Sequence, residues 1–477
     1  SVIAKNPVVT NERSNAALYP NGFDPKIQAK IKDLSLSVGL KHKAGQWMLD
    51  LNNTYGQNNF HYYNANTLNA SIGASSPTEF DAGGFGFAQN TSSLNATRGF
   101  NVLKGLNFSA GVEFRLDQYD IVAGEEGSWK NYLQNFRVDT FINKNTSSIV
   151  ELDTVYSPGG AQGFPGFQPK SALKSTRSNL GAFVDAELDV TKQWLVGAAI
   201  RFENYSDFGK TLNGKLATRY RINDKINIRA SVSSGFRAPS LQQIYFNTIY
   251  TNFEGGQPIE IQLANNSSTL ATKVGVPTLK QEKSFNYSVG LTIKPMKAFT
   301  ITADAYMVQV KDRIILTGTF YNDDNVIGAD LVALNVGAAN FFTNAVNTTN
   351  QGLDIILTYN KKIGKGRLTT SLASNFNKLV VDKVNTSSKL AGKEDVYFSN
   401  REKAFLIASA PKSKLNFTVT YDINNFSVTY RLVRYGEVIL LGYDDKQQIY
   451  TPKLVSDIAL GYSINKHIGV NIGVIIY

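Results

Sequence analysis

The chain has 477 residues, of which 42% are hydrophobic, 18% are charged and none is cysteine. A soluble protein of this length normally divides into several domains, but no change of composition, proline-rich linker or block of charge divides this one. No uninterrupted apolar stretch approaches the roughly 18 residues that a membrane-spanning helix needs. We therefore expect one large unit that is not a helical membrane protein and that has neither disulfides nor thiolate metal sites.

The first third of the chain is predicted to contain two pairs of strands. Residues 1–26 show no alternation and are predicted to be irregular. From there on, apolar and polar residues alternate with a period of two, the pattern of a strand with one apolar face. The first pair is predicted at 34–40 and 47–51, followed by a long loop from about 57 to 90. The second pair lies at about 94–102 and 106–122, and a longer loop runs from it to residue 175.

Four closely spaced strands are predicted between residues 176 and 235, and four further pairs follow. These pairs lie at 285–293 with 299–310, 353–359 with 368–376, 415–421 with 426–432, and 456–464 with 468–476. In the first of them, Phe285, Tyr287 and Val289 alternate with Asn286 and Ser288. The pattern predicts about sixteen strands, with short turns and mostly long loops in alternate places.

This pattern predicts an all-β fold, a transmembrane antiparallel β-barrel with short periplasmic turns and long extracellular loops. The predicted strands reach about ten residues or more, whereas strands of soluble sheets usually have about five or six. A soluble sandwich or propeller is the alternative. It fits less well because the apolar faces carry almost no charge, and one Lys or Arg at the middle of a bilayer would cost about 2–4 kcal/mol.

The formal net charge of +11 could indicate a nucleic-acid partner, because basic surfaces bind phosphate backbones. The Lys and Arg residues are scattered, however, and no recognised nucleic-acid motif accompanies them. We predict no nucleic-acid partner. Attraction to outer-membrane lipid, to lipopolysaccharide or to an anionic small-molecule ligand explains the sign of the charge more simply.

A family resemblance rests on several short strings of residues. The string Gly235-Phe236-Arg237-Ala238-Pro239-Ser240 resembles the strand-to-loop segment of TonB-dependent outer-membrane receptors. The strings at 279–284, 302–306, 311–314 and 347–354 resemble the same family, and those at 66–71 and 80–84 resemble its Bacteroidetes-type members. The resemblance spans about residues 30–477 and implies a non-enzymatic receptor that imports a scarce nutrient, such as a siderophore–metal chelate, a carbohydrate, a vitamin or a peptide.

The same resemblance implies a plug domain inside a barrel of about 22 strands. No plug, TonB-contacting segment or signal sequence precedes Ser1, and Val470-Asn471-Ile472-Gly473-Val474 resembles the penultimate strand of the family. We therefore expect residues 1–477 to be a single barrel domain that lacks the plug, the first strands and the last strand. The implied partners are the plug and, through the missing N-terminal segment, the TonB complex. The alternative is that Tyr477 ends a complete sixteen-stranded, porin-like passive channel without a plug.

Candidate ligand-binding residues lie in the predicted loops, where aromatic side chains adjoin Asn and Gly. They are Tyr62, Tyr63, Trp129, Tyr245 and Phe246. Aromatic faces and amide groups would suit a sugar, a chelated metal or a peptide about equally, so the pattern does not identify the ligand. Packing within the loops or a place in an interfacial girdle is the alternative for each of these residues.

The four closely spaced strands are predicted to carry a polar wall on the lumen side. Ala182, Val184 and Ala186 face one way, which turns the neighbouring acidic residues inward. The inward-facing cations are Arg201, Lys215, Arg219, Arg221 and Arg229. These residues either form cross-strand ion pairs that stabilise the interior or, for Arg219, Arg221 and Arg229, meet acidic groups of a plug. The three histidines are too far apart for a metal motif, and we predict no cofactor, metal or catalytic set.

Overall fold

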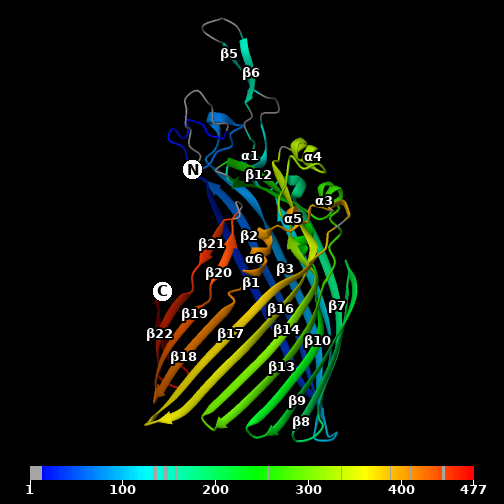
Figure 1. The fold of residues 1–477 in the computed structure, drawn as a ribbon, viewed down its shortest axis with the longest axis vertical. Helices are drawn as coiled ribbons and strands as arrows, with labels where there is room; N and C mark the ends of the chain where they lie inside the picture. The colour runs from blue at the N-terminus through cyan, green and yellow to red at the C-terminus, as the bar shows by residue number, and fades with distance from the viewer. Residues whose placement is uncertain are drawn as a thin grey trace.

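A tall, curved wall of antiparallel strands forms most of the computed structural model, and most of the loops gather at one end of it (Figure 1). The structure describes residues 13–132, 137–142, 149–155, 158–254, 257–334, 336–386, 388–390, 392–408, 410–442 and 446–476. Each strand of the wall pairs with the next wall strand along the chain. The predicted count of about sixteen wall strands is confirmed. They are β1 (Lys26–Ala44), β2 (Trp47–Ala65), β3 (Glu79–Phe100), β4 (Leu106–Val122), β7 (Leu173–Asp189), β8 (Trp194–Tyr205), β9 (Gly209–Asn223), β10 (Ile226–Arg237), β13 (Glu282–Met296), β14 (Phe299–Leu316), β16 (Ala338–Ile363), β17 (Gly366–Val384), β18 (Ser413–Ile423), β19 (Phe426–Tyr435), β22 (Lys453–Ser463) and β23 (Gly469–Ile476).

Two kinds of connection join these strands. At the periplasmic end the connections are short, for example 45–46 between β1 and β2 and 297–298 between β13 and β14. At the extracellular end most are long, and they contain smaller elements of their own. These are η1 (Gly73–Ser75), α1 (Glu126–Trp129), β5 (Arg137–Ile142), β6 (Ile149–Val155), η2 (Pro169–Ser171), α2 (Leu241–Tyr245), β11 (Thr248–Glu254), β12 (Gln257–Ala264), α3 (Thr269–Val274), β15 (Phe320–Tyr321), α4 (Gly328–Ala333), η3 (Ser388–Leu390), α5 (Glu394–Tyr397), α6 (Asn400–Ile407), β20 (Val438–Leu441) and β21 (Gln447–Tyr450).

The predicted alternation of β13 is confirmed by its two faces. Phe285, Tyr287 and Val289 lie on the outer face and are 40%, 42% and 59% exposed. On the lumen face, the hydroxyls of Ser288 and Ser231 are 2.8 Å apart, and the amide of Asn286 donates to Ser233 at 3.3 Å. An outer face of apolar side chains can contact lipid, while the polar face lines the interior.

Buried residues concentrate in the extracellular loops, because the wall itself is one layer thick. One cluster, which we call the loop core, includes Phe320, Phe341 and Tyr397, each at most 1% exposed. The Tyr397 hydroxyl lies 2.6 Å from that of Thr343 on β16, which ties α5 to the wall. Strand β12 also pairs in parallel with the start of β16. The loops around α3, α4 and α5 therefore form a packed layer at the mouth of the wall.

The prediction of a long loop from about residue 57 to residue 90 is wrong. Strand β2 continues to Ala65, β3 begins at Glu79, and the two pair over this whole stretch, from Tyr55 opposite Asn90 to Ala65 opposite Glu79. Their residues here are polar, aromatic or small on both faces, so the alternation disappears although the ladder of backbone hydrogen bonds continues. A strand that extends beyond the lipid no longer needs an apolar face.

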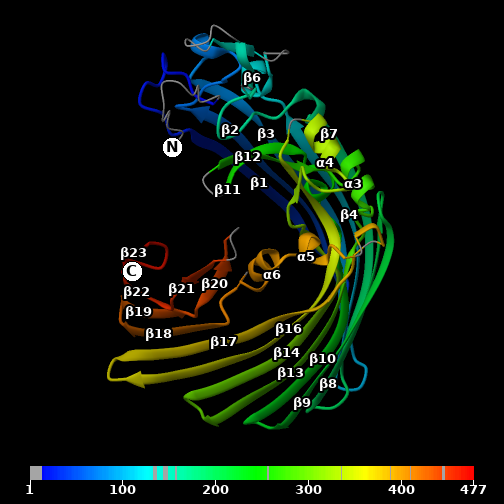
Figure 2. The same cartoon turned by 45° about the horizontal axis from the view of Figure 1, so that its top comes forward.

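The wall is curved and, in the view of Figure 2, it encloses an interior that is open between β1 and β22–β23. Among the pairings of the described residues, β1 joins the wall only through β2, and β23 only through β22. No helix in the described part of the chain is long and apolar enough to cross a membrane.

Candidate functional site

Helix α6 lies within the curve of the wall (Figure 2). Two cavities are lined by residues of this helix and lie on either side of its first turn. The helix begins after Ser399, whose hydroxyl accepts a hydrogen bond from the Arg401 backbone N–H at 3.1 Å and donates to the Glu402 carboxylate. A serine at this position satisfies one of the backbone donors that a helix start leaves free. Arg401 and Glu402 line both cavities, so the first turn of α6 is the partition between them.

The first cavity, which we call the lumen cavity, has a volume of about 810 Å³ and lies between α6 and the strands β10, β13 and β14. Arg237, the last residue of β10, stands opposite Glu282, the first residue of β13. Its guanidinium donates two hydrogen bonds to that carboxylate, at 2.9 and 2.6 Å. Glu282 also accepts from the Ile314 backbone N–H at 2.7 Å. Glu282 therefore joins three strand ends at the cavity wall, and Arg237 is held in a fixed orientation.

Arg313 lines the same cavity and has no ion-pair partner among the described residues. An extra residue in β14 shifts the register between Val310 and Arg313, and Asp312 in this bulge has φ = 55°. Such bulges turn a side chain away from the direction that regular alternation gives it. The hydrogen bond from Arg313 Nη1 to Thr348 Oγ1 is long, at 3.4 Å. The nearest carboxylate that acts on this cation is Glu282, which is already engaged by Arg237, so Arg313 has no carboxylate of its own among the described residues.

The charged side chains lining the lumen cavity give it a positive balance. Three arginines, Arg237, Arg313 and Arg401, face two glutamates, Glu282 and Glu402. The apolar part of the lining comes from α6 and β14, and the Arg401 guanidinium lies 4.6 Å from the centroid of the Phe405 ring. An apolar cavity with a few fixed polar groups is the usual form of a small-molecule site, and this one favours an anion.

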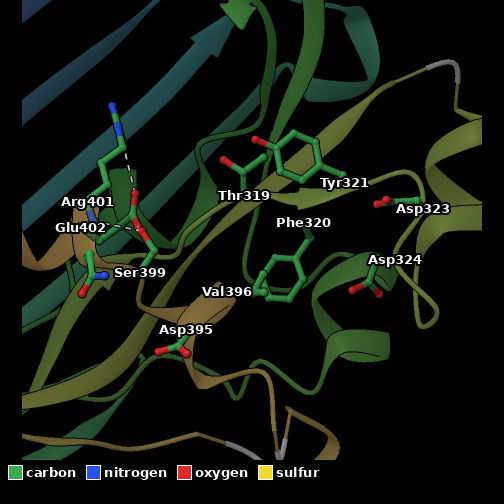
Figure 3. Close-up of a pocket in the computed structure, with 11 residues that line it drawn as sticks. Thr319, Phe320, Tyr321, Asp323, Asp324, Asp395, Val396, Ser399, Arg401 and Glu402 are labelled. Atoms are coloured by element: carbon green, nitrogen blue, oxygen red, sulfur yellow. Dashed lines mark hydrogen bonds and ion pairs between the residues drawn. The ribbon is translucent and has the colours of Figure 1, made fainter. Parts of the chain in front are cut away.

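The second cavity, which we call the loop pocket, has a volume of about 440 Å³ and is acidic (Figure 3). Figure 3 shows Ser399, Arg401 and Glu402 on one side of it, Asp323 and Asp324 on the other, and Phe320 and Val396 between them. Asp395 completes the lining carboxylates. The pocket therefore carries the opposite charge balance to the lumen cavity.

Asp324 has a structural role in the loop pocket. Lys393 donates to its Oδ2 at 2.6 Å, and its Oδ1 accepts from the backbone N–H groups of Val326 and Ile327 at 2.7 and 3.2 Å, just before α4. Burial raises the pKa of this carboxyl, but the Lys393 ammonium and the two backbone donors outweigh it, so the pKa of Asp324 lies below its usual value. This side chain holds the 321–327 turn against α5.

Three of the five sequence-predicted loop residues meet in one aromatic cluster. Tyr62, Tyr245 and Phe246 pack against buried Tyr119, Phe164 and Phe167, and the ring centroids of Tyr62 and Phe164 are 4.9 Å apart. Tyr62 lies on β2, so its assignment to a loop is wrong, whereas Tyr245 ends α2. Their rings contribute to the packing that anchors the loops at 158–172 and 241–250 on the wall.

The other two predicted loop residues lie apart from this cluster. Tyr63 is also on β2, not in a loop, and points away from Tyr62, toward His61 at a ring distance of 5.0 Å. Trp129 is in a loop as expected, at the end of α1, and its indole N–H donates to the Gly124 carbonyl at 3.2 Å. Neither residue lines the lumen cavity or the loop pocket.

The five predicted lumen cations divide into paired and unpaired ones. Arg201 bonds Glu113 at 3.1 Å and Glu203 at 2.5 Å. Arg229 Nε donates to Asp304 at 2.9 Å, and Arg219 lies 4.0 Å from Asp189. The remaining two, Lys215 and Arg221, form no ion pair within the described part of the chain.

Sequence reasoning did not identify the lumen cavity as a site. Arg237 belongs to the string at 235–240 and Arg313 to the string at 311–314, so both residues stood in segments that resemble the receptor family. The signal that could have singled out Arg313 is its place at the end of a strand, where a bulge changes the direction of the side chain. Helix α6 gives almost no sequence signal, because its apolar residues have no clear helical periodicity.

The comparisons with known proteins agree with this architecture. A family model described as TonB dependent receptor-like, beta-barrel matches residues 5–475. Among solved structures, the siderophore receptor PirA from Acinetobacter baumannii has a TM-score of 0.57 at 14% identity, over 93% of this chain and 58% of that one. The ferric enterobactin receptor PfeA from Pseudomonas aeruginosa has a TM-score of 0.57 at 12% identity, over 93% of this chain and 56% of that one.

One sequence relative is the vitamin B12 transporter BtuB of Vibrio cholerae, 33% identical over 69 residues, which are 14% of this chain and 11% of that protein. The chain thus spans less than two thirds of each of these proteins. The family match covers almost the whole chain, and the solved structures with a similar fold include a siderophore receptor and a ferric enterobactin receptor. The chain belongs to the TonB-dependent receptor-like β-barrel family, and it is an outer-membrane protein of a Gram-negative bacterium.

Proposed function

We propose that this chain forms the barrel wall and extracellular loops of a receptor for the TonB-dependent uptake of a scarce nutrient, with the ligand held in the lumen cavity. The observation that supports this most is Arg313, a cation without an ion-pair partner among the described residues, on a cavity of about 810 Å³ beneath the extracellular loops. A ligand that crosses the mouth of the wall reaches this cavity before it reaches the lower lumen.

We propose an anionic ligand, with a metal chelate as the first class to test. Three arginines against two glutamates make the cavity attractive to carboxylate, catecholate or phosphate groups, and Phe405 offers a ring against which a flat ligand can stack. The solved neighbours include receptors for siderophores and for ferric enterobactin, and the sequence relative transports vitamin B12. A neutral carbohydrate would leave Arg313 without a counter-charge.

The remaining parts of the transport machinery are also proposals. Lys215 and Arg221 lack ion pairs in the described chain, and we propose that they meet acidic groups of a plug domain in the lumen. Arg201 and Arg229 already have carboxylate partners, which favours a structural role for them. We also propose that further strands complete the wall, because β1 and β23 carry unpaired backbone groups that lipid cannot satisfy.

Uptake of a panel of labelled ferric chelates tests the proposal. Cells with the intact gene, cells with the gene deleted, and cells that lack TonB are compared at equal external concentrations. We expect saturable uptake of at least one chelate that requires both the gene and TonB. Uptake that rises linearly with concentration and persists without TonB would contradict the proposal and would instead show a passive, porin-like channel.

A further inference from the structure

Two lysines face each other on the outer surface of the wall. Lys283 on β13 and Lys311 on β14 are direct partners in the register of the two strands, and both side chains are exposed. Like charges directly opposite each other destabilise a sheet. Neither lysine has a carboxylate partner among the described residues, and the nearby Asp312 is held by Lys280 at 3.0 Å. The pair is therefore a positively charged site without a carboxylate partner among the described residues.

The lysine pair lies at the extracellular edge of the lipid-facing band. On β13 the outer face is apolar from Phe285 to Ile293, and Lys283 is the next outward residue toward the long loops. In an outer-membrane barrel this edge is the height of the lipid headgroups in the outer leaflet. A cation at this position meets phosphate groups rather than acyl chains.

An apolar groove on the same outer surface ends beside the lysine pair. Its volume is about 670 Å³, and its lining includes Val184, Ile200, Gly214, Ser234 and Phe285 on five consecutive wall strands. Val184 pairs with Ile200, Ile200 with Gly214, and Ser234 with Phe285. The Gly214 backbone N–H donates to the Ser234 hydroxyl at 3.0 Å. These five residues therefore lie side by side across the five strands. The two small residues between Ile200 and Phe285 leave the wall hollow there.

Phe285 joins the groove to the lysine pair. It lines the groove, and the Lys311 ammonium lies 5.8 Å from the centroid of its ring. We propose that this surface binds a phosphorylated lipid of the outer leaflet, with a phosphate between Lys283 and Lys311 and an acyl chain in the groove. The phosphate would neutralise the opposed ammonium groups, and the chain would cover the apolar hollow.

Native mass spectrometry of the protein extracted from outer membranes in a non-ionic detergent tests this site. The probes are bis-phosphorylated lipid A and the same lipid with its phosphates removed. The lysine variant combines Lys283→Gln and Lys311→Gln, and the groove variant is Gly214→Leu, for which the outer side is open because the nearest atom to an added Cβ is a backbone oxygen at 3.7 Å. Lys294→Gln, at the periplasmic end of the same strand and also exposed, is the matched control.

We expect the lysine variant to bind the phosphorylated lipid at least about tenfold more weakly than the wild type and to bind the dephosphorylated lipid unchanged. The groove variant should bind both lipids more weakly, and the Lys294→Gln control should match the wild type. Heat-modifiable migration on a gel confirms that each variant is folded. Equal binding of both lipids by the wild type, or wild-type affinity of the lysine variant for the phosphorylated lipid, would overturn the proposal.

Discussion

The two cavities on either side of α6 share Arg401 and Glu402. They differ in whether their other charged side chains have ion-pair partners. In the loop pocket, the buried carboxylate of Asp324 is fully engaged by Lys393 and by backbone donors, while Asp323 and Asp395 are exposed to water. In the lumen cavity, Arg237 is engaged by Glu282, but Arg313 is not matched. An acidic lining can thus have a structural role, whereas we infer that Arg313, a partly buried cation without an ion pair among the described residues, contacts a ligand.

Replacing Arg313 by Gln should have the largest effect on ligand binding in the lumen cavity. We expect the affinity for the transported chelate to fall by about 10- to 100-fold, because one charge-assisted contact to an ionised ligand is lost. Uptake at low external concentration, measured with the labelled chelate panel, reports the change. Asp395→Asn in the loop pocket is the matched control and should leave uptake unchanged. Equal loss in both variants would contradict the distinction between the cavities.

Replacing Asp324 by Asn tests the architectural side of the comparison. The change leaves Lys393 without its carboxylate and should destabilise the loops around α4 locally by about 1–3 kcal/mol, because the pair is only partly buried. Because the pKa of Asp324 is lowered in the folded protein, its stabilising effect is complete above its unfolded pKa and disappears as the pH falls through the folded value. Limited proteolysis of the 321–334 segment at neutral and acidic pH measures this. A pH profile identical in the wild type and the variant would count against it.

Tyr62 and Tyr63 are neighbours on β2 but differ in burial, because only Tyr62 packs in the aromatic cluster. Tyr62→Ala removes a ring from a packed cluster and should cost about 2 kcal/mol of stability, since the site is half-buried rather than fully enclosed. Tyr63 is 38% exposed, so Tyr63→Ala should change stability by less than about 0.5 kcal/mol. Denaturant unfolding in detergent compares the two. A larger effect on ligand uptake from Tyr63→Ala than from Tyr62→Ala would indicate that the exposed ring binds ligand.

Arg229 is a lumen cation with an ion-pair partner, in contrast to Arg313. We therefore expect its replacement to have a smaller effect than that of Arg313. It donates to Asp304 and to Thr292, but both members of the ion pair are about one third exposed. A double-mutant cycle with Arg229→Gln and Asp304→Asn should give a coupling energy of about 0.5–1 kcal/mol and no change in uptake. A coupling energy near zero together with reduced uptake would instead support a contact between Arg229 and a plug.

The strands could be predicted because a lipid-facing wall imposes period-two alternation. The limits of that signal are visible at β2, where the stretch from Gln57 to Ala65 continues the ladder above the lipid and no longer needs an apolar face. That charged side chains face the lumen was also predictable, since the same alternation places Asp185 and Arg201 on the inner face of the wall. Whether Arg229 pairs with Asp304 depends on strands that are far apart in the chain, so only the register could decide it.

The site depends on features that leave little trace in the sequence. The bulge before Arg313 adds a single residue, and α6 is one short helix within a long, irregular connection. The aromatic residues of the loops were selected because they suit ligand stacking, but Tyr62 and Phe246 pack inside the cluster. Packing between loops is set by contacts across the whole mouth of the wall, which local patterns do not contain.

The most direct test of the ligand site is a structure of the protein with the chelate that the uptake panel identifies. If the ligand binds in the lumen cavity, we expect it to contact Arg313 and Arg237 and to stack against the ring of Phe405 on α6. A ligand bound instead in the loop pocket, among Asp323 and Asp395, would contradict the assignment of the lumen cavity as the binding site.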